Sequence, residues 1–276
     1  MADLHSRVLL DSPLVGLADV ACNAPRSKAG PAEDGGAGFQ LVVPRRGVFC
    51  VHSGSSVVAV DPNSVLLLGG HAEYRFSHPV HGGDECTAVA LGPALAEEAL
   101  GARPARSGTA SPRAQLRAGM LTAMLARGAL SELEAEEATL ALVADLAPSL
   151  SREANTRPRV APAGLRRVQE VRALLAADPA ADWRLAGVAH AVHCSPFHLA
   201  RQFRAVTGET IARYLLRLRL ACALQRVTAG ETALARLAVE LGFAHHSHFT
   251  ARFRATFGVT PSEARRIVTA GGVAAP

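Results

Sequence analysis

The pattern of apolar and polar positions divides the chain into a β-rich part and a helical part. In the first 92 residues, apolar or β-branched runs such as "FQLVVPRRGVFCVH" and "SSVVAVDPNSVLLLGG" are broken by Gly, Pro, Asn and Asp. The sequence Asp61-Pro62-Asn63 has the chemistry of a tight turn between two strands. Several short strands of this kind predict a small β-barrel or sandwich over residues 1–92.

From residue 93 to residue 150 the apolar spacing changes to a helical period. Ser131 and Glu134 have the spacing of a capping box, which predicts the start of a helix. Apolar residues then recur at helical spacing as far as Pro148, where we expect the last turn to be disrupted. Residues 151–164, "SREANTRPRVAPAG", are polar, contain two prolines and predict a linker.

Residues 165–268 are helical in pattern and contain two similar segments. These are "LAGVAHAVHCSPFHLARQFRAVTGET", from Leu185, and "LARLAVELGFAHHSHFTARFRATFGVT", from Leu234. Each copy predicts a short helix, a tight turn and a second helix, the order of a helix-turn-helix unit. The turn needs a left-handed backbone, which suits Gly242 in the second copy better than His193 in the first. The second helix of such a unit can enter the major groove of DNA.

The second helix of each copy has one face that predicts burial and one that is free. Phe249, Phe253 and Phe257 recur every four residues and are expected to face inward, as is Phe203 in the first copy. The residues expected to contact DNA are Ser195, Phe197, His198, Ala200, Arg201 and Arg204 in the first copy, and His245, His246, Ser247, Thr250 and Arg254 in the second. We expect Arg201 to contact bases, and Arg204 and Arg254 to contact phosphates, although solvated surface arginines are the alternative.

The long helix expected between the copies, "TIARYLLRLRLACALQRV", would span about 25 Å. It is long enough to hold two recognition helices about 34 Å apart, which is one turn of DNA.

Charge is distributed unevenly between the two parts. Residues 1–150 contain 11 basic and 16 acidic residues, whereas residues 165–276 contain 15 arginines and 7 acidic residues. The net charges of these segments are therefore −5 and +8, which indicates that only the C-terminal part binds a polyanion. The chain has no apolar run of about 18–20 residues and no signal-peptide pattern at its start, so we expect a cytoplasmic protein without a membrane partner.

These motifs resemble a known family. Residues 165–268 resemble the DNA-binding domain of AraC/XylS-family transcription regulators, through "SPFHLARQFRAVTG" and "LARLAVELGFAHHSHFTARFRATFGVTPSEARR". Two positions depart from the family pattern: Ala251 stands where members commonly have arginine, and His193 replaces the first-copy glycine. Residues 1–92 resemble the family's cupin-like ligand-binding domain, through "LVVPRRGVF", "DPNSVLLLGGHAEYRFSHPV" and "GGDECTAVALG".

The resemblance implies an α+β multidomain protein. Its parts would be an N-terminal cupin-like β-barrel with a helical extension over residues 93–150, an all-α double helix-turn-helix domain, and a flexible tail over residues 269–276. The implied function is sequence-specific regulation of transcription, as an activator or a repressor, without enzymatic activity or a cofactor. The implied partners are promoter or operator DNA, RNA polymerase, a small-molecule effector bound within residues 1–92, and a second copy of the chain. The second copy would bind through the helical extension, for which support of the barrel is the alternative role.

Candidate effector contacts are Arg45, His71, Tyr74 and His78. His71, His78, His81 and Asp84 also suggest a metal site, but the HxH pair and following glutamate of metal-binding cupins are absent. We therefore expect no metal and assign these histidines structural or effector-binding roles. Two alternative functions stay open, namely a cupin enzyme tethered to DNA, and a metal or redox sensor, the latter acting through Cys50 or Cys86.

Overall fold

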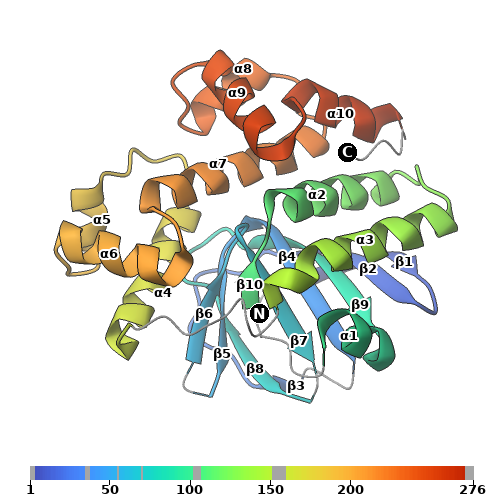
Figure 1. Ribbon diagram of the computed structural model, residues 1–276, viewed down its shortest axis with the longest axis horizontal. Helices are drawn as coiled ribbons and strands as arrows, with labels where there is room; N and C mark the ends of the chain where they lie inside the picture. Colours follow the sequence, from blue (N-terminus) through green and yellow to red (C-terminus); the bar gives the residue numbers. More distant parts are fainter. Residues whose placement is uncertain are drawn as a thin grey trace.

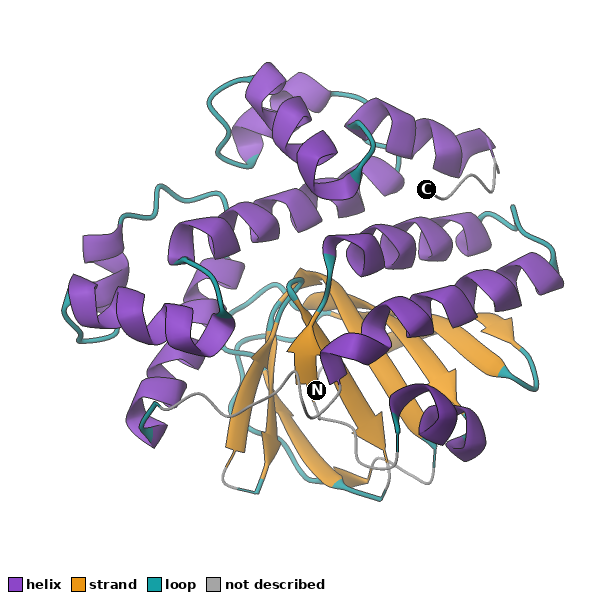
Figure 2. Ribbon diagram, viewed as in Figure 1, coloured by secondary structure: helices purple, strands orange, loops and turns teal. Residues whose placement is uncertain are grey.

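The structure is a computed structural model that describes residues 4–34, 38–54, 56–69, 71–101, 107–150 and 160–270. Strands occupy the lower part of the molecule, and helices lie across and above them (Figure 1). Figure 2 shows the same arrangement by secondary structure, with the strands gathered in the lower middle of the view and helices beside and above them. The α+β class predicted from the sequence is confirmed.

The strands form two antiparallel sheets. The six-stranded sheet has the order β1-β2-β9-β4-β7-β10, and the four-stranded sheet has the order β3-β8-β5-β6. Strand pairing among the described residues gives these two sheets and no closed ring. The strands are β1 (Leu4–Asp11), β2 (Val15–Cys22), β3 (Glu33–Asp34), β4 (Phe39–Gly47), β5 (Phe49–Ser53), β6 (Ser56–Val60), β7 (Ser64–Gly69), β8 (Glu73–Ser77), β9 (Asp84–Leu91) and β10 (Ser107–Thr109).

The two sheets face each other across a small apolar core. Val42 and Leu66 from the six-stranded sheet pack there with Phe49, Val51 and Tyr74 from the four-stranded sheet. Because side chains alternate along a strand, the other face of the six-stranded sheet is free to pack against helices.

Three helices cover that other face: α1 (Pro93–Leu100), α2 (Pro112–Ala126) and α3 (Glu132–Leu150). The predicted capping box is present, since Ser131 N donates to Glu134 Oε2 at 2.8 Å and Glu134 N donates to Ser131 Oγ at 3.4 Å. The expectation that Pro148 disrupts the last turn is wrong, because α3 continues to Leu150. Leu150 is fully buried in the core with the sheet, and this burial holds the last turn in place.

The remaining helices are α4 (Pro162–Ala177), α5 (Leu185–Ala191), α6 (Pro196–Thr207), α7 (Ile211–Thr228), α8 (Leu234–Glu240), α9 (His246–Phe257) and α10 (Pro261–Ala270). They form two apolar cores, one around α4 to α7 and one that joins α7 to α10 with α2. Within the part of the chain that the structure describes, no helix combines the length and the apolar character that a membrane crossing requires.

Three details differ from the expected domain plan. The short strand β10 lies inside the segment expected to be helical and pairs with β7. Helix α4 begins at Pro162, inside the expected linker, because a proline is well suited to the first helical position. Helix α10 extends to Ala270, into the expected tail. The rest of the expected linker, residues 151–159, and of the tail, residues 271–276, lies outside the described residues.

Candidate nucleic-acid interface

The first helix-turn-helix unit consists of α5 and α6. Val188 and Ala189 of α5 are buried against the unit, and Cys194 N closes the turn by donating to Ala189 O at 2.9 Å. His193 takes the left-handed conformation in this turn, with φ of 50°. Ser195 then caps α6, because its Oγ accepts a hydrogen bond from His198 N at 3.3 Å.

The second unit, α8 and α9, repeats this backbone with different side chains. Phe243 N donates to Ala238 O at 2.9 Å, which is the counterpart of the bond in the first turn. Gly242 has φ of 75°, and a Cβ on it would lie 2.8 Å from Ala180 O. His245 is at the N-cap of α9 but makes no side-chain capping hydrogen bond. The repeat predicted from the sequence is therefore present, with a glycine turn and a weaker cap in its second copy.

The expected DNA-contacting residues all lie at the surface of α6 and α9 or at their N-termini. Eight are exposed and three, namely His198, Ala200 and Thr250, are partly exposed. Phe197 is 79% exposed, an unusual position for a large aromatic ring. Among the described residues, no ion pair is formed by Arg201, Arg204 or Arg254. These arginines are therefore available to an anionic partner.

The buried faces of the same two helices fix their orientation. In α9, Phe249, Phe253 and Phe257 are buried and stack edge to face, with ring centroids 5.8 Å and 4.7 Å apart along the series. In α6, Phe203 is fully buried and meets the ring of Tyr214 edge to face at 5.3 Å. The phenylalanine spacing therefore serves packing, and the opposite face of each helix is left open.

Helix α7 lies between the two units and holds them apart (Figure 1). Its 18 residues correspond to a length of about 27 Å. Arg219 on α7 also connects the units, because its guanidinium donates to Pro179 O at 2.7 Å, Ala181 O at 2.9 Å and Gly242 O at 3.0 Å. The turn of the second unit is thereby tied to the loop that follows α4.

A buried polar cluster joins the sheets to α4 and α7, the helices that pack against the first unit, and we call it the Asp61 latch. Tyr214 Oη donates to Asp61 Oδ2, and Arg172 Nε donates to Tyr214 Oη at 2.8 Å. Arg172 also donates to Ser64 Oγ at 2.6 Å, and Asn63 Nδ2 donates to Tyr214 O at 3.1 Å. The Asp61 latch therefore consists of Asp61, Asn63 and Ser64 from the β6–β7 turn together with Arg172 of α4 and Tyr214 of α7.

Burial raises the pKa of Tyr214 well above its ordinary value; the charge of Arg172 lowers it and that of Asp61 raises it again. The phenol consequently stays protonated and acts as the donor to Asp61. The sequence predicted only a turn at Asp61 and Asn63. One feature of the sequence did indicate a buried polar partner. Arg172 is a charged residue among apolar positions of α4 that are buried, namely Val168, Val171 and Leu175.

The N-terminal part contains a cavity of about 430 Å³ between its sheets. Its lining is mainly apolar, with polar groups from Glu33, Gln40, His78 and Asp84. Of the four expected effector contacts, His78 lines this cavity. The residues that line it are Leu4, Val20, Cys22, Glu33, Gln40, Val42, Phe49, Leu68, Phe76, His78, Asp84, Cys86 and Ala88.

The other three expected effector contacts lie elsewhere. Tyr74 is buried and its hydroxyl bonds the backbone of Gly69, as acceptor from N at 3.2 Å and donor to O at 3.1 Å. His71 is exposed, with φ of 57°. Arg45 donates to Asp19 and to Cys86 O, and lines a second, much smaller cavity of about 10 Å³. The structure does not bring the four residues together.

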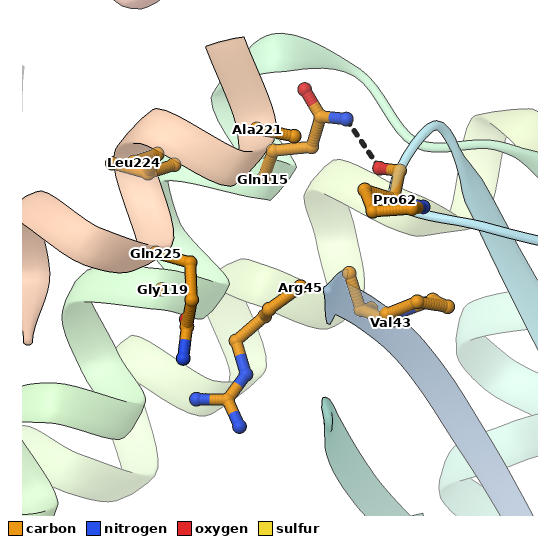
Figure 3. A pocket seen from close by; sticks show the side chains of 9 residues that line it. Val43, Arg45, Pro62, Gln115, Gly119, Ala221, Leu224 and Gln225 are labelled. Atoms are coloured by element: carbon orange, nitrogen blue, oxygen red, sulfur yellow. Dashed lines mark hydrogen bonds between the residues drawn. The ribbon is translucent and has the colours of Figure 1, made fainter. Parts of the chain in front are cut away.

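Arg45 reaches the junction of three elements. Figure 3 shows it on β4, near Gly119 of α2 and near Gln225 of α7, while Gln115 of α2 donates a hydrogen bond to Pro62 O. Alternation along β4 accounts for this direction, because Arg45 lies on the same face as Leu41 and Val43, which pack on the helix side of the sheet, and Val43 lines the same small cavity.

Comparison with known proteins agrees with the repeat. Residues 188–267 match the family model described as "Helix-turn-helix domain". The chain is 30% identical over 89 residues to a putative AraC-like transcription regulator from Streptomyces lividans, covering 32% of this chain and 29% of that protein. It is 32% identical over 146 residues to the transcriptional activator RhrA from Rhizobium meliloti, covering 50% of this chain and 46% of that protein.

Among solved structures, an AraC-type regulator from Chromobacterium violaceum is 26% identical, with 39% of this chain and 96% of that chain covered and a TM-score of 0.37. The matches to both curated relatives span less than half of their length. Two helix-turn-helix units joined by one helix, a matching family model and AraC-like relatives agree on the C-terminal part. Residues 188–267 of this chain therefore form a helix-turn-helix domain that is similar to those of AraC-like regulators.

Proposed function

We propose that this chain is a sequence-specific transcription regulator of the AraC type, in which α6 and α9 enter successive major grooves of one duplex. The observation that carries the proposal is the pair of open helix faces held at the two ends of α7. Both faces are basic, and neither is covered by the N-terminal part. A single rigid helix of about 27 Å suits binding on one side of DNA, where successive major grooves are about 34 Å apart.

Within this proposal, some residues of the two faces contact bases and others contact phosphates. Arg201 lies in the middle of the open face of α6 and is exposed, which suits bidentate bonding to the edge of a guanine. Arg204 and Arg254 are in the last turns of α6 and α9 and suit phosphate contacts, which position the protein without reading sequence. Ala251 offers no polar atom, so more of the specificity falls to α6.

The N-terminal cavity is the proposed effector site. Its volume of about 430 Å³ lies within the usual range for small-molecule pockets, roughly 300–1,000 Å³. A mainly apolar wall with a few polar side chains suits a small, largely apolar molecule that carries one polar group. Contacts with RNA polymerase, pairing of two copies through α1 to α3 and a cytoplasmic location are further parts of this proposal, which rest on the resemblance to the AraC type.

The test is DNA binding by full-length protein with Arg201→Ala and a charge-matched control, Arg75→Ala. Arg75 is exposed on β8 in the sheet part, so its replacement removes the same charge away from the proposed interface. A site is first selected from a pool of random duplexes, and affinities are then measured on that site and on scrambled DNA.

We expect Arg201→Ala to weaken binding to the selected site by about 1–3 kcal/mol, with a much smaller effect on scrambled DNA. Arg75→Ala should leave both affinities unchanged. Equal losses on both duplexes for Arg201→Ala would assign this residue to phosphate instead. Failure of the wild-type protein to select any site would remove the proposal.

A further inference from the structure

A group of metal-ligand side chains lies at one end of the N-terminal cavity, far from the helix-turn-helix units in sequence. Cys22 Sγ is 3.6 Å from His78 Nε2, which is 3.1 Å from Asp84 Oδ1. The three ligand atoms all lie within 4.8 Å of one another, and all three residues are buried. A thiol, an imidazole and a carboxylate thus converge on one point.

The fold itself brings these residues together. Cys22 ends β2 and Asp84 begins β9, and the two are direct partners in the antiparallel register of these strands. His78 follows β8 of the opposite sheet. The group therefore connects the two sheets at one end, where rigid backbone fixes the direction of each side chain.

Local contacts hold the group further in place. Ser27 and His78 exchange two bonds, with Ser27 N donating to His78 O at 2.9 Å and His78 N donating to Ser27 Oγ at 3.2 Å. Gly83 has φ of 63°, and a Cβ on it would lie 1.7 Å from Cys22 O. Only glycine allows the chain to pass this close to Cys22 immediately before Asp84.

The spacing of the ligand atoms fits a tetrahedral ion. For a zinc ion bound at usual bond lengths, about 2.3 Å to sulfur and about 2.0–2.2 Å to nitrogen and oxygen, tetrahedral geometry separates sulfur from nitrogen by roughly 3.6 Å and nitrogen from oxygen by roughly 3.4 Å. The separations of 3.6 Å and 3.1 Å agree with the first value and are close to the second. A tetrahedral ion would require the nitrogen–oxygen separation to widen by about 0.3 Å, and the third pair, sulfur and carboxylate oxygen, lies within 4.8 Å.

We propose that Cys22, His78 and Asp84 bind one divalent transition-metal ion of the zinc class. A thiolate and an imidazole favour such an ion over Ca²⁺ or Mg²⁺, which prefer oxygen ligands. All three residues line the cavity of about 430 Å³, so the fourth coordination position opens toward it. Cys86 also lines the cavity, and its Sγ donates to Asp84 Oδ2 at 3.4 Å, so it orients the carboxylate. The ion would give a small molecule in the cavity a direct point of attachment.

The site differs from the metal centre of cupins that the sequence analysis considered. That interpretation grouped His71 and His81 with His78 and Asp84, whereas the structure leaves His71 and His81 exposed and places Cys22 in the group. The proposed metal site does not depend on DNA binding. A metal-binding assay tests the metal site, and a DNA-binding assay tests the proposed function, so each can fail without the other.

The test uses full-length protein freed of metal with a chelator and titrated with Co²⁺ or Zn²⁺ alone. We expect one ion per chain, and a near-ultraviolet charge-transfer absorption with Co²⁺ that reports a thiolate ligand. Cys22→Ser should abolish this absorption, and His78→Ala and Asp84→Asn should each weaken binding at least about tenfold. Cys194→Ser and His71→Ala are matched controls that should bind as the wild type does.

Thermal unfolding separates loss of the site from loss of the fold. At one metal concentration, bound metal should raise the unfolding temperature of the wild type and of both controls by more than that of Cys22→Ser or Asp84→Asn. Circular dichroism of the metal-free variants checks that they are folded. Absence of a stoichiometric ion in the wild type, or unchanged Co²⁺ absorption in folded Cys22→Ser, would overturn the proposal and leave only a buried hydrogen bond between His78 and Asp84.

Discussion

The two helix-turn-helix units share a backbone but are attached to the rest of the molecule by different chemistry. The first unit is joined to the sheets through α4 and α7, which pack with Val48 and Ala59 and also form the Asp61 latch, a set of directional hydrogen bonds with a buried ion pair. The second unit is joined through an apolar contact, in which Phe253 and Phe257 share a core with Met120 and Met124 of α2. A small displacement breaks hydrogen bonds but only shifts an apolar contact, so the first attachment is the more sensitive to a change in the sheets.

The largest expected effect comes from breaking the Asp61 latch. Asp61→Ala leaves the buried Arg172 guanidinium without its carboxylate, 3.4 Å away in the wild type. Loss of one partner of a buried ion pair usually costs about 3–5 kcal/mol of the free energy of unfolding. Denaturant titration measures this loss. Hydrogen exchange should become faster in α4 to α6 and stay unchanged in α8 to α10, whereas a uniform increase would contradict the distinction between the two attachments.

Truncation of Met120, in the apolar contact with the second unit, should lower the free energy of unfolding somewhat less. Its effect on hydrogen exchange should fall on the second unit instead of the first. Met120→Ala removes a flexible side chain that is 8% exposed and contacts the second unit. A cost of about 2–3 kcal/mol is expected, the lower part of the range for this substitution, because thioether sites can collapse. Hydrogen exchange should now increase in α8 to α10. If α5 and α6 respond instead, the two units are coupled through α7 and Arg219 more strongly than through their own attachments.

The smallest expected effects compare the two turns. Gly242→Ala places a Cβ at positive φ and 2.8 Å from Ala180 O, so a loss of about 1–2 kcal/mol in unfolding free energy is expected. His193→Gly relieves a left-handed histidine and should be neutral or stabilising by up to about 1 kcal/mol. Thermal and denaturant unfolding of the single variants measure both. If His193→Gly instead lowers the unfolding free energy as much as Gly242→Ala does, the two turns do not have equivalent conformations.

The sequence allowed prediction of features that depend on local spacing. The open faces of α6 and α9 followed from the four-residue recurrence of Phe249, Phe253 and Phe257 and from the repeat. The capping box of Ser131 and Glu134 and the turn at Asp61 followed from residue types that favour one local conformation.

Features that depend on distant residues could not be predicted in the same way. The bond from Tyr214 to Asp61 joins residues 153 positions apart, and nothing near either residue identifies the other. Strand β10 has three residues, too few for a periodic signal. Arg45 lies on the helix side of β4, a direction that depends on which face of the sheet packs against α2 and α7, and Cys22 was overlooked because its partner Asp84 is adjacent only through strand register.

The alternation of side chains along β9 gives adjacent residues opposite surroundings. Asp84 and Cys86 face the cavity, whereas Glu85 between them accepts a hydrogen bond from Gln225 of α7 at 2.6 Å. A rotation of this strand by a few degrees about its own axis, caused by a molecule in the cavity, would therefore move the Glu85 carboxylate against α7, the helix that sets the distance between α6 and α9. The wall of the cavity and the contact with α7 are thus adjacent residues of one strand.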